Sequence, residues 1–174
     1  MPTLRPVRAS DAPAVLDAFA SSPDMARQGA VTTAAEANDY VARCTSPGSR
    51  VFAVTGEDDV LRGAVGIDLD EENRTGWVWY WMHARHRGKG WTAAAVATVA
   101  DWALAEGGCE RLELGHRVNN PASGRVAVAA GFVPEGRERG KFLIDGERVD
   151  VLTYGRILTD PVPATPRLAL LAPF

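Results

Sequence analysis

A cluster of cations and glycines at residues 85–90 carries the clearest chemical signal in the sequence. It reads Arg-His-Arg-Gly-Lys-Gly and opens the alanine-rich segment 90–106. The N-terminus of a helix exposes N–H groups without partners and carries partial positive charge, and glycine lets an anion approach the backbone closely. The cluster therefore predicts a site for a polyanion such as a diphosphate at the start of a long helix.

This anion site must be local, because the chain as a whole is acidic. Its 174 residues carry a formal net charge of −3, which argues against a nucleic-acid-binding protein. The length and a hydrophobic content of 46% predict one domain with its own core. Because no stretch is apolar enough for a signal peptide or a membrane span, we expect a cytoplasmic protein with no membrane association. Cys44 and Cys109 lack metal-ligand spacing and predict two free thiols and no metal.

Three other interpretations of the glycine cluster can be weighed. A P-loop is excluded, because the glycine spacing differs and no Gly-Lys-Ser/Thr follows. Residues 88–93 fit the dinucleotide pattern G-x-G-x-x-A, with Glu113 on the next strand, but the bulky Trp91 and the preceding hairpin oppose a Rossmann unit. A surface loop with a solvated group of charges is the third alternative.

Hydrophobic periodicity and turn residues predict the elements around the cluster. Ser10 and either Thr32 or Thr33 are the expected N-caps of the first two helices. The order of strands and helices predicts an α+β fold, a mixed α/β domain whose antiparallel first half is followed by β-α-β crossovers. The expected helices cover residues 10–21, 33–44, 90–106 and 120–130, and the expected strands cover 3–8, 50–55, 60–69, 77–82 and 111–118, with two more around the Asp145-Gly146 turn.

Three motifs in this order resemble the GNAT superfamily of N-acetyltransferases. Arg-x-x-Gly-x-Gly between a strand and a long helix looks like the acyl-CoA pyrophosphate loop of that family. Residues 4–19 resemble its first strand and helix, and residues 119–132 resemble its fourth helix and the Gly-Phe that follows. The resemblance covers residues 3 to about 157. Asn120-Pro121-Ala122-Ser123 is similar to a motif of the branch that contains the ribosomal-protein N-terminal acetyltransferases.

The resemblance implies an acetyltransferase domain over residues 1–158, followed by a Pro-rich tail over 159–174. It implies about four helices and a mostly antiparallel sheet of about seven strands, splayed between the fourth and fifth. Acetyl-CoA is the implied co-substrate, with its pantetheine arm in the splayed gap and its diphosphate on the backbone amides of residues 87–90. The residues implied in binding it are Trp81, Met82, His83, Arg85, Arg87, Gly88, Lys89, Gly90, Thr92 and Asn120.

The implied reaction is direct attack of a neutral amine on the thioester carbonyl. The backbone amide of Met82 would polarise the thioester oxygen. Many family members place a tyrosine four residues before the Gly of Gly-Phe to protonate the leaving thiolate, but this chain has Ala127 there. Ser123, one helical turn earlier, matches the serine of the related branch. Capping of the helix that begins near Asn120 is the alternative role for Ser123.

A general base and the acceptor pocket are less defined by the sequence. The related branch often has a carboxylate where this chain has Trp77, and a peptide α-amine, whose pKa is near neutrality, needs little help from a base. Alternation places Trp77, Trp79 and Trp81 on one face of a strand, where they either pack against a helix or form the aromatic wall of an acceptor pocket. The candidates for a base or for acceptor contacts are Asp68, Asp70, Glu72, His83 and His116.

The sequence thus predicts an N-acetyltransferase, an enzyme that acts on the primary amine of a peptide N-terminus or of a small molecule. We expect it to be a monomer or a homodimer. A non-catalytic acyl-CoA-binding sensor of the same fold is the main alternative, because the family tyrosine and the strand-four carboxylate are both missing. A nicotinamide-cofactor binder is a further alternative.

Overall fold

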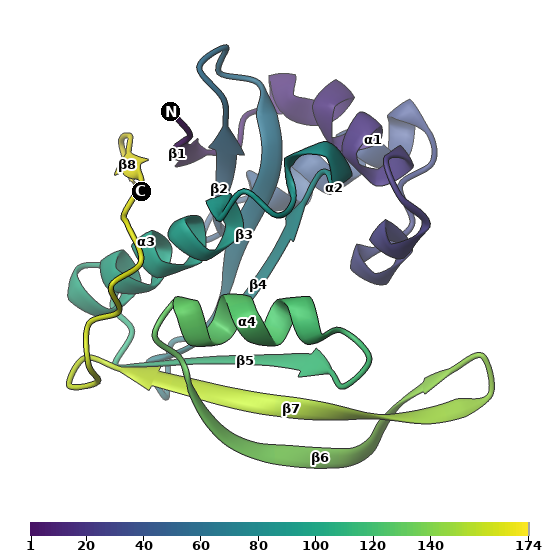
Figure 1. The fold of residues 1–174 in the computed structure, drawn as a ribbon. Coiled ribbons are helices and arrows are strands. Elements are labelled where there is room, and N and C mark those ends of the chain that lie inside the picture. Colours follow the sequence, from purple (N-terminus) through teal and green to yellow (C-terminus); the bar gives the residue numbers. More distant parts are fainter. Residues whose placement is uncertain (174) are drawn as a thin grey trace.

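The computed structural model describes residues 1–173, whose strands form one sheet between two layers of helices (Figure 1). The strands are β1 (Thr3–Pro6), β2 (Arg50–Thr55), β3 (Leu61–Asp70), β4 (Thr75–Met82), β5 (Arg111–Arg117), β6 (Val133–Ile144), β7 (Glu147–Ile157) and β8 (Ala169–Leu170). The helices are α1 (Ala12–Ala20), α2 (Ala34–Cys44), α3 (Trp91–Ala105) and α4 (Pro121–Ala129), with short 3-10 turns η1 (Ala9–Asp11), η2 (Pro23–Gln28) and η3 (Ala84–His86).

The sheet has the order β6-β7-β5-β4-β3-β2-β1-β8. Its strand pairs are antiparallel except β4 with β5 and β1 with β8. The predicted α+β class and mostly antiparallel sheet are confirmed. The eighth strand is a difference from the sequence-based expectation, and it comes from the C-terminal tail.

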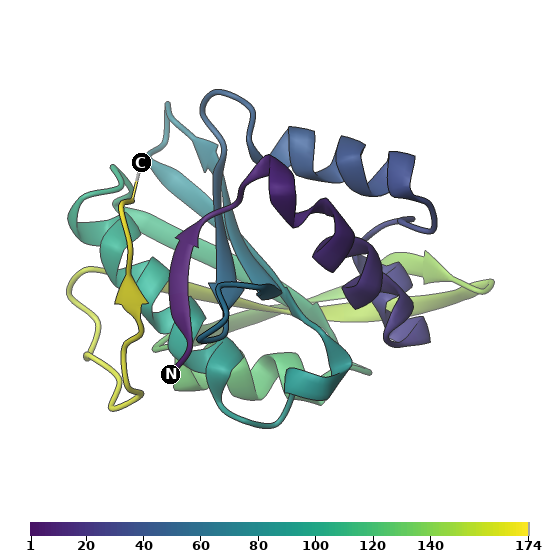
Figure 2. The same cartoon turned by 90° about the horizontal axis from the view of Figure 1, so that it is seen from above.

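The sheet separates two hydrophobic cores, as its alternating side chains require. Phe52 and Val65 point into the core beneath α3 and α4, whereas Ala53 and Ala64 point into the core beneath α1 and α2. Figure 2 shows α1 and α2 on the side of the sheet opposite to α3. In this arrangement α3, the helix that follows the glycine cluster, packs on β4.

Helix starts follow local hydrogen-bond chemistry. Thr33 caps α2 as predicted, in a capping box with Glu36. The predicted cap at Ser10 is wrong, because Ser10 lies inside η1 and α1 begins at Ala12. Asp11, the N-cap of α1, is buried and receives two hydrogen bonds from the Arg5 guanidinium, each 2.8 Å long. The Asp11 carboxylate is thus bound to Arg5 and to the Arg8 N–H, and it makes no capping hydrogen bond to α1.

The tail folds back along the domain and becomes β8, which pairs with β1 beside the N-terminus (Figure 1). On the way it crosses α3, where the Leu168 N–H donates to the Thr98 hydroxyl at 2.9 Å. Asp101 of α3 accepts from two arginines, Arg156 of β7 at 2.6 Å and Arg167 of the tail at 2.5 Å. The tail is therefore attached to the domain by a strand pair and by a shared carboxylate.

Removing this carboxylate should destabilise the protein strongly. The side chain of Arg156 is only 5% exposed, and Asp101 binds one of its nitrogens while the other two have no hydrogen-bond partner among the described residues, so Asp101→Ala leaves a buried charge uncompensated. We expect the free energy of unfolding to fall by about 3 kcal/mol. Chemical denaturation would measure the loss. Glu110→Ala is the matched control, since it removes an exposed ion pair with Arg74, and we expect it to cost less than about 1 kcal/mol.

The contribution of Asp101 to the free energy of unfolding should depend on pH. Burial would raise the pKa of Asp101, but the hydrogen bonds from Arg167 and Arg156 hold it below its ordinary value. A carboxyl whose folded-state pKa is lowered stabilises the protein above its unfolded-state pKa and loses this effect as the pH falls through the folded-state value. The stability difference between wild type and Asp101→Ala should therefore shrink in acid. A difference that stays constant down to pH values near 2 would contradict the role of the ionised carboxylate.

Other expectations concern cysteines, membranes and metals. Cys44 and Cys109 are free and buried, as predicted, and burial raises the pKa of the Cys44 thiol to about 11. Among residues 1–173 no helix is both long and apolar enough to cross a bilayer. Within the same range no three His, Cys, Asp or Glu side chains are arranged to hold a metal ion.

Candidate active site

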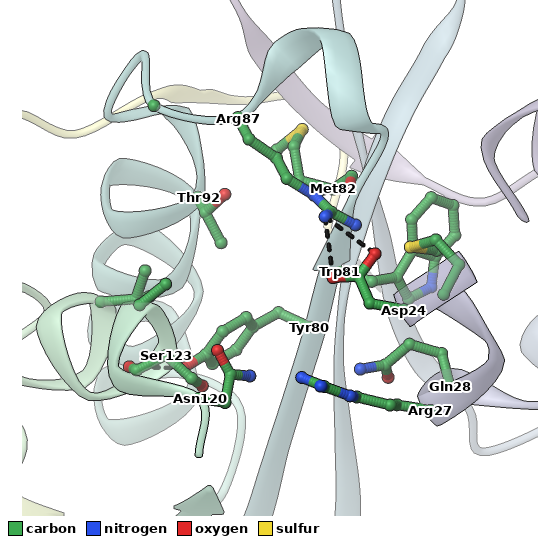
Figure 3. Close-up of a pocket in the computed structure, with 14 residues that line it drawn as sticks. Asp24, Arg27, Gln28, Tyr80, Trp81, Met82, Arg87, Thr92, Asn120 and Ser123 are labelled. Carbon is green, nitrogen blue, oxygen red and sulfur yellow. Dashed lines mark hydrogen bonds and ion pairs between the residues drawn. The ribbon is translucent and has the colours of Figure 1, made fainter. Parts of the chain in front are cut away.

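The pairing between β4 and β5 is short. It extends only from Thr75 with Arg111 to Trp77 with Glu113, after which the strands separate. The predicted splay between the fourth and fifth strands is therefore present in the structure. A cavity of about 210 Å³ fills the gap next to β4, and η2, α3 and α4 complete its walls (Figure 3). Its lining includes Asp24, Arg27, Gln28, Tyr80, Trp81, Met82, Arg87, Gly88, Thr92, Asn120 and Ser123.

The strand backbone presents hydrogen-bonding groups to this gap. The His83 N–H bonds to the Arg62 carbonyl of the β3 side at 2.8 Å, so alternation along an antiparallel pair turns Trp81 toward β3 as well. The N–H and C=O groups of Tyr80 and Met82 then face the gap, where β5 no longer pairs with them. Of the three strand residues implied in pantetheine binding, Met82 is the one whose backbone is directed at the cavity.

The glycine cluster leaves a row of N–H groups free. Only from Ala94 onward does α3 make its own hydrogen bonds, with the Ala94 N–H donating to Gly90 at 3.0 Å. For the N–H groups of residues 88–93 the described part of the chain supplies no acceptor. Gly88 and Gly90 have φ values of +73° and +78°, and a Cβ at either position would meet no atom within 4 Å. The positive φ explains why glycine stands here, and the open space lets an anion reach the amides.

Unlike its neighbours, Arg87 has no free N–H group, and its side chain is bound by two other parts of the fold. Its N–H bonds to the Ala84 carbonyl at 3.3 Å, and its guanidinium binds the Met82 carbonyl at 2.9 Å and the Asp24 carboxylate at 2.8 Å and 3.0 Å. Burial would raise the pKa of Asp24, but hydrogen bonds from Ser22 and Arg87 lower it below its ordinary value. Arg87 thus ties η2 to the end of β4 across the top of the cavity (Figure 3).

The other cations of the cluster lie elsewhere. Arg85 is part of a separate hollow with Asp17, Ser21 and His83, and it does not line the cavity in the gap. Lys89 is exposed, with its ammonium group 5.5 Å from the Trp91 ring centroid. Thr92 lines the cavity, one turn into α3. The structure therefore brings Arg87, Gly88 and Thr92 together but separates Arg85 from them.

Two hydroxyl groups meet on the far wall of the gap. The Tyr80 and Ser123 oxygens are 2.6 Å apart, and the Tyr80 hydroxyl also lies 3.0 Å from the Ser123 carbonyl oxygen. Burial raises the pKa of Tyr80 to about 12, so this phenol stays protonated at neutral pH. Asn120 is the N-cap residue of α4, yet its side chain makes no capping hydrogen bond and points into the cavity beside Ser123 (Figure 3). The Ser123 hydroxyl is thus engaged with Tyr80 and not with a helix end.

A second cavity of about 220 Å³ continues from the first on the side of β5. The two cavities share Arg27, Gln28, Tyr80, Asn120 and Ser123, so the hydroxyl pair stands at their junction. The walls of the second cavity are the aromatic residues Trp77, Trp79 and Phe142 together with His116 and Arg117. An acyl donor in the first cavity and an amine in the second would therefore meet beside Ser123 and Tyr80.

The three tryptophans of β4 divide between the two roles that the sequence left open. Trp81 is buried in the core beneath α1 and α2, where its indole N–H donates to the Tyr40 hydroxyl at 2.9 Å. Trp77 and Trp79 line the second cavity. The Trp79 ring lies against Gly66, where a Cβ would come within 2.2 Å of it. Two of the three indoles thus form an aromatic wall.

Both candidate histidines are committed to hydrogen bonds. His83 Nδ1 accepts from the Arg85 N–H at 3.1 Å, so Nε2 carries the proton and donates to Asp17. His116 Nδ1 lies 2.9 Å from the Arg117 carbonyl, which fixes the proton on Nδ1 and leaves Nε2 to accept from the Tyr154 hydroxyl at 3.1 Å. The His116 ring lines the second cavity, but its lone pair is already used.

The acidic candidates lie outside the cavities. Asp68 accepts from the Trp79 indole N–H at 3.1 Å and so holds the aromatic wall from behind. Asp70 binds Asn73 in the β3–β4 turn, where the hydrogen bonds lower the pKa of Asp70. Glu72 is exposed in the same turn. Among the described residues that line the second cavity there is no carboxylate.

Sequence reasoning missed three contributors to the site. Tyr80 could have been found, because alternation along residues 77–82 places it on the face opposite to the tryptophans. Arg27 and Gln28 lie on η2, a 3-10 turn without hydrophobic periodicity, and no sequence signal directs them to the gap. Their position depends on the Arg87–Asp24 ion pair, which is a tertiary contact.

A sheet opened between two parallel strands, with free helix amides at the mouth of the gap, is suited to an extended ligand that ends in a polyanion. Comparison with known proteins agrees. Residues 3–133 match the family model of the acetyltransferase (GNAT) domain. The chain therefore belongs to the GNAT acetyltransferase family, as its motifs predicted.

The similar proteins include members of the predicted branch. The chain is 30% identical to the ribosomal-protein-serine acetyltransferase of Escherichia coli over 112 residues, which are 63% of this chain and 62% of that protein. It thus spans less than two thirds of that relative. Among solved structures, the ribosomal-protein-S5-alanine acetyltransferase of Vibrio fischeri has a TM-score of 0.79 at 20% identity, covering 90% of this chain and 93% of that one. A spermidine N-acetyltransferase chimera from Vibrio cholerae has a TM-score of 0.78 at 20% identity, covering 90% and 95%.

Proposed function

We propose that the protein transfers the acetyl group of acetyl-CoA to the primary amine of a peptide N-terminus or of a small molecule. The observation that carries the proposal is the junction of the two cavities, where the Tyr80–Ser123 hydroxyl pair stands between the second cavity and the cavity that the Met82 N–H faces. The name of the E. coli relative, a ribosomal-protein-serine acetyltransferase, supports a protein as the acceptor. The spermidine N-acetyltransferase of similar fold supports a small amine as the alternative acceptor.

The residues of the cavity fit a CoA thioester. The N–H groups of residues 88–93 offer donors to a diphosphate, and Thr92 lies next to them. The Tyr80 backbone and the Met82 N–H offer an edge to which an amide-bearing arm can add like a further strand. Asn120 presents an uncommitted amide from the opposite wall. Once bound, the thioester supplies an activated acetyl carbonyl.

The protein contributes position, polarisation and proton transfer. Holding amine and thioester in adjoining cavities removes much of the entropic barrier. The Met82 N–H stabilises the negative charge that develops on the carbonyl oxygen during attack. As the new C–N bond forms and the C–S bond breaks, the nitrogen loses one proton and the sulfur gains one. Ser123 donates its proton to the sulfur and takes up the proton that the nitrogen releases, while the Tyr80 hydroxyl holds the Ser123 oxygen through their 2.6 Å contact.

Release of free thiol from acetyl-CoA with a panel of amines tests the proposal. We expect turnover well above hydrolysis with at least one peptide α-amine, and a rate that rises with pH as the α-ammonium group loses its proton near neutrality. Mass spectrometry of the acceptor should show a single acetyl group. Tight binding of CoA without turnover on any amine would instead identify the acyl-CoA-binding sensor.

A further inference from the structure

The charged residues that line the second cavity bear on which class of amine it can bind. Two arginines line it, Arg27 from η2 and Arg117 from the end of β5. Neither forms a salt bridge among the described residues. Arg27 extends from η2 across the gap toward Asn120 (Figure 3), and the Arg117 guanidinium lies over the Phe142 ring, 5.2 Å from its centroid. A ring face satisfies part of the positive charge but takes none of the five N–H donors in the guanidinium plane.

Asp24 interacts electrostatically with Arg27, but among the described residues no carboxylate forms an ion pair with either arginine. Asp24, on the same turn as Arg27, is held by both of its oxygens on Arg87. Asp68 receives the Trp79 indole N–H and lies behind that ring. Lys141 adds a third cation at the rim, 5.8 Å from the centroid of the Trp77 ring, and its own partner is Glu138. In a chain of net charge −3, this cavity is a local positive region.

We propose that the acceptor is an amine flanked by carboxylates, namely a peptide N-terminus with Asp or Glu among its first residues. The inference rests on the proposed acetyl transfer. Guanidinium groups bind carboxylates in a bidentate manner, and the indoles of Trp77 and Trp79 offer a flat surface for the peptide between the amine and its acidic side chains. A polyamine carries further positive charges, which the same two arginines repel.

Three synthetic peptides that share the N-terminal serine test this inference. They continue with Asp-Glu, Asn-Gln or Lys-Lys, and spermidine and free glutamate serve as small amines of opposite charge. We expect kcat/KM for the acidic peptide to exceed that for the basic peptide by roughly tenfold or more, and the ratio to shrink as salt is raised to about 1 M. Free glutamate tests whether a small amine with carboxylates is enough. We expect it to be a poorer acceptor than the acidic peptide, because only the peptide reaches both the cavity and its rim.

Charge reversal identifies the residues responsible. Arg27→Glu and Arg117→Glu should each lower kcat/KM for the acidic peptide by roughly three- to tenfold and raise it for the basic one. Arg27→Gln and Arg117→Gln give the milder change if a reversal unfolds the protein. Arg43→Glu is the matched control, since it alters net charge equally on the exposed face of α2 and should leave the order of the peptides unchanged.

The failures of the two proposals are distinguishable. Equal turnover of all three peptides, or a preference for spermidine, overturns the charge inference and leaves acetyl transfer intact. If no amine is acetylated, acetyl transfer fails, and the charge inference is then decided by peptide binding to the CoA-saturated protein. Quenching of tryptophan fluorescence reports this binding, because Trp77 and Trp79 line the cavity. Equal affinity for acidic and basic peptides in that titration also overturns the inference.

Discussion

Gly90→Glu should abolish the binding of acetyl-CoA while the protein stays folded. Gly90 is the N-cap residue of α3, next to the free amides, with a φ of +78° and no atom within 4 Å of its Cβ position. A glutamate there places a carboxylate where a diphosphate would lie, and like charges in contact cost several kcal/mol. We expect the affinity to fall by at least about a hundredfold, since every 1.4 kcal/mol is a factor of ten. Calorimetry with CoA measures the change.

The fold provides a matched control for this substitution. Gly48, in the turn between α2 and β2, also has a positive φ of +84° and no atom within 4 Å of a Cβ. Gly48→Glu therefore carries the same backbone strain, of order 1–2 kcal/mol, and the same charge. We expect both variants to melt a few degrees below wild type and only Gly90→Glu to lose CoA. Wild-type affinity in a folded Gly90→Glu protein would show that the phosphates bind elsewhere.

The second large effect concerns the hydroxyl pair. Ser123→Ala and Tyr80→Phe should each lower kcat by roughly a hundredfold, the lower end of what a proton donor contributes, with a much smaller change in CoA affinity. The double variant should lose little more than either single variant, because the two hydroxyls act as one unit through their 2.6 Å contact. Single-turnover kinetics together with CoA titration separate the chemical step from binding.

Two further measurements constrain this role. Tyr80 has a pKa of about 12, so its ionisation should not appear in a pH–rate profile below about pH 10, and a fall in rate there would contradict a protonated phenol. Tyr40→Phe removes another largely buried phenol, the one that accepts from Trp81, and should lower stability without lowering kcat. Equal losses of turnover and CoA affinity in Ser123→Ala would reduce Ser123 to a structural residue.

Local chemistry explains which elements the sequence predicted well. The capping box at Thr33 and the turn at Asp145-Gly146, where both residues have positive φ, involve residues a few positions apart, and such interactions are legible in a sequence. The start of α1 was misjudged because Ser10 lies inside the 3-10 turn η1, whose Asp11 carboxylate binds Arg5 of β1. The eighth strand was missed because it depends on Asp101 and Thr98, which are distant in the chain.

The sequence by itself determined the family, the glycine-rich start of α3 and the order of the elements up to β7. Each of these depends on residues that are contiguous in the chain. The helix start, for example, needs only glycines, cations and the helix that follows. Only the tertiary structure decided which side chains share the gap. Separation of β4 from β5 turned the Met82 backbone toward empty space, brought Tyr80 onto Ser123, and set Arg27 and Arg117 in one cavity. Residues from four different elements meet there, and such proximity arises from packing, which no local pattern encodes.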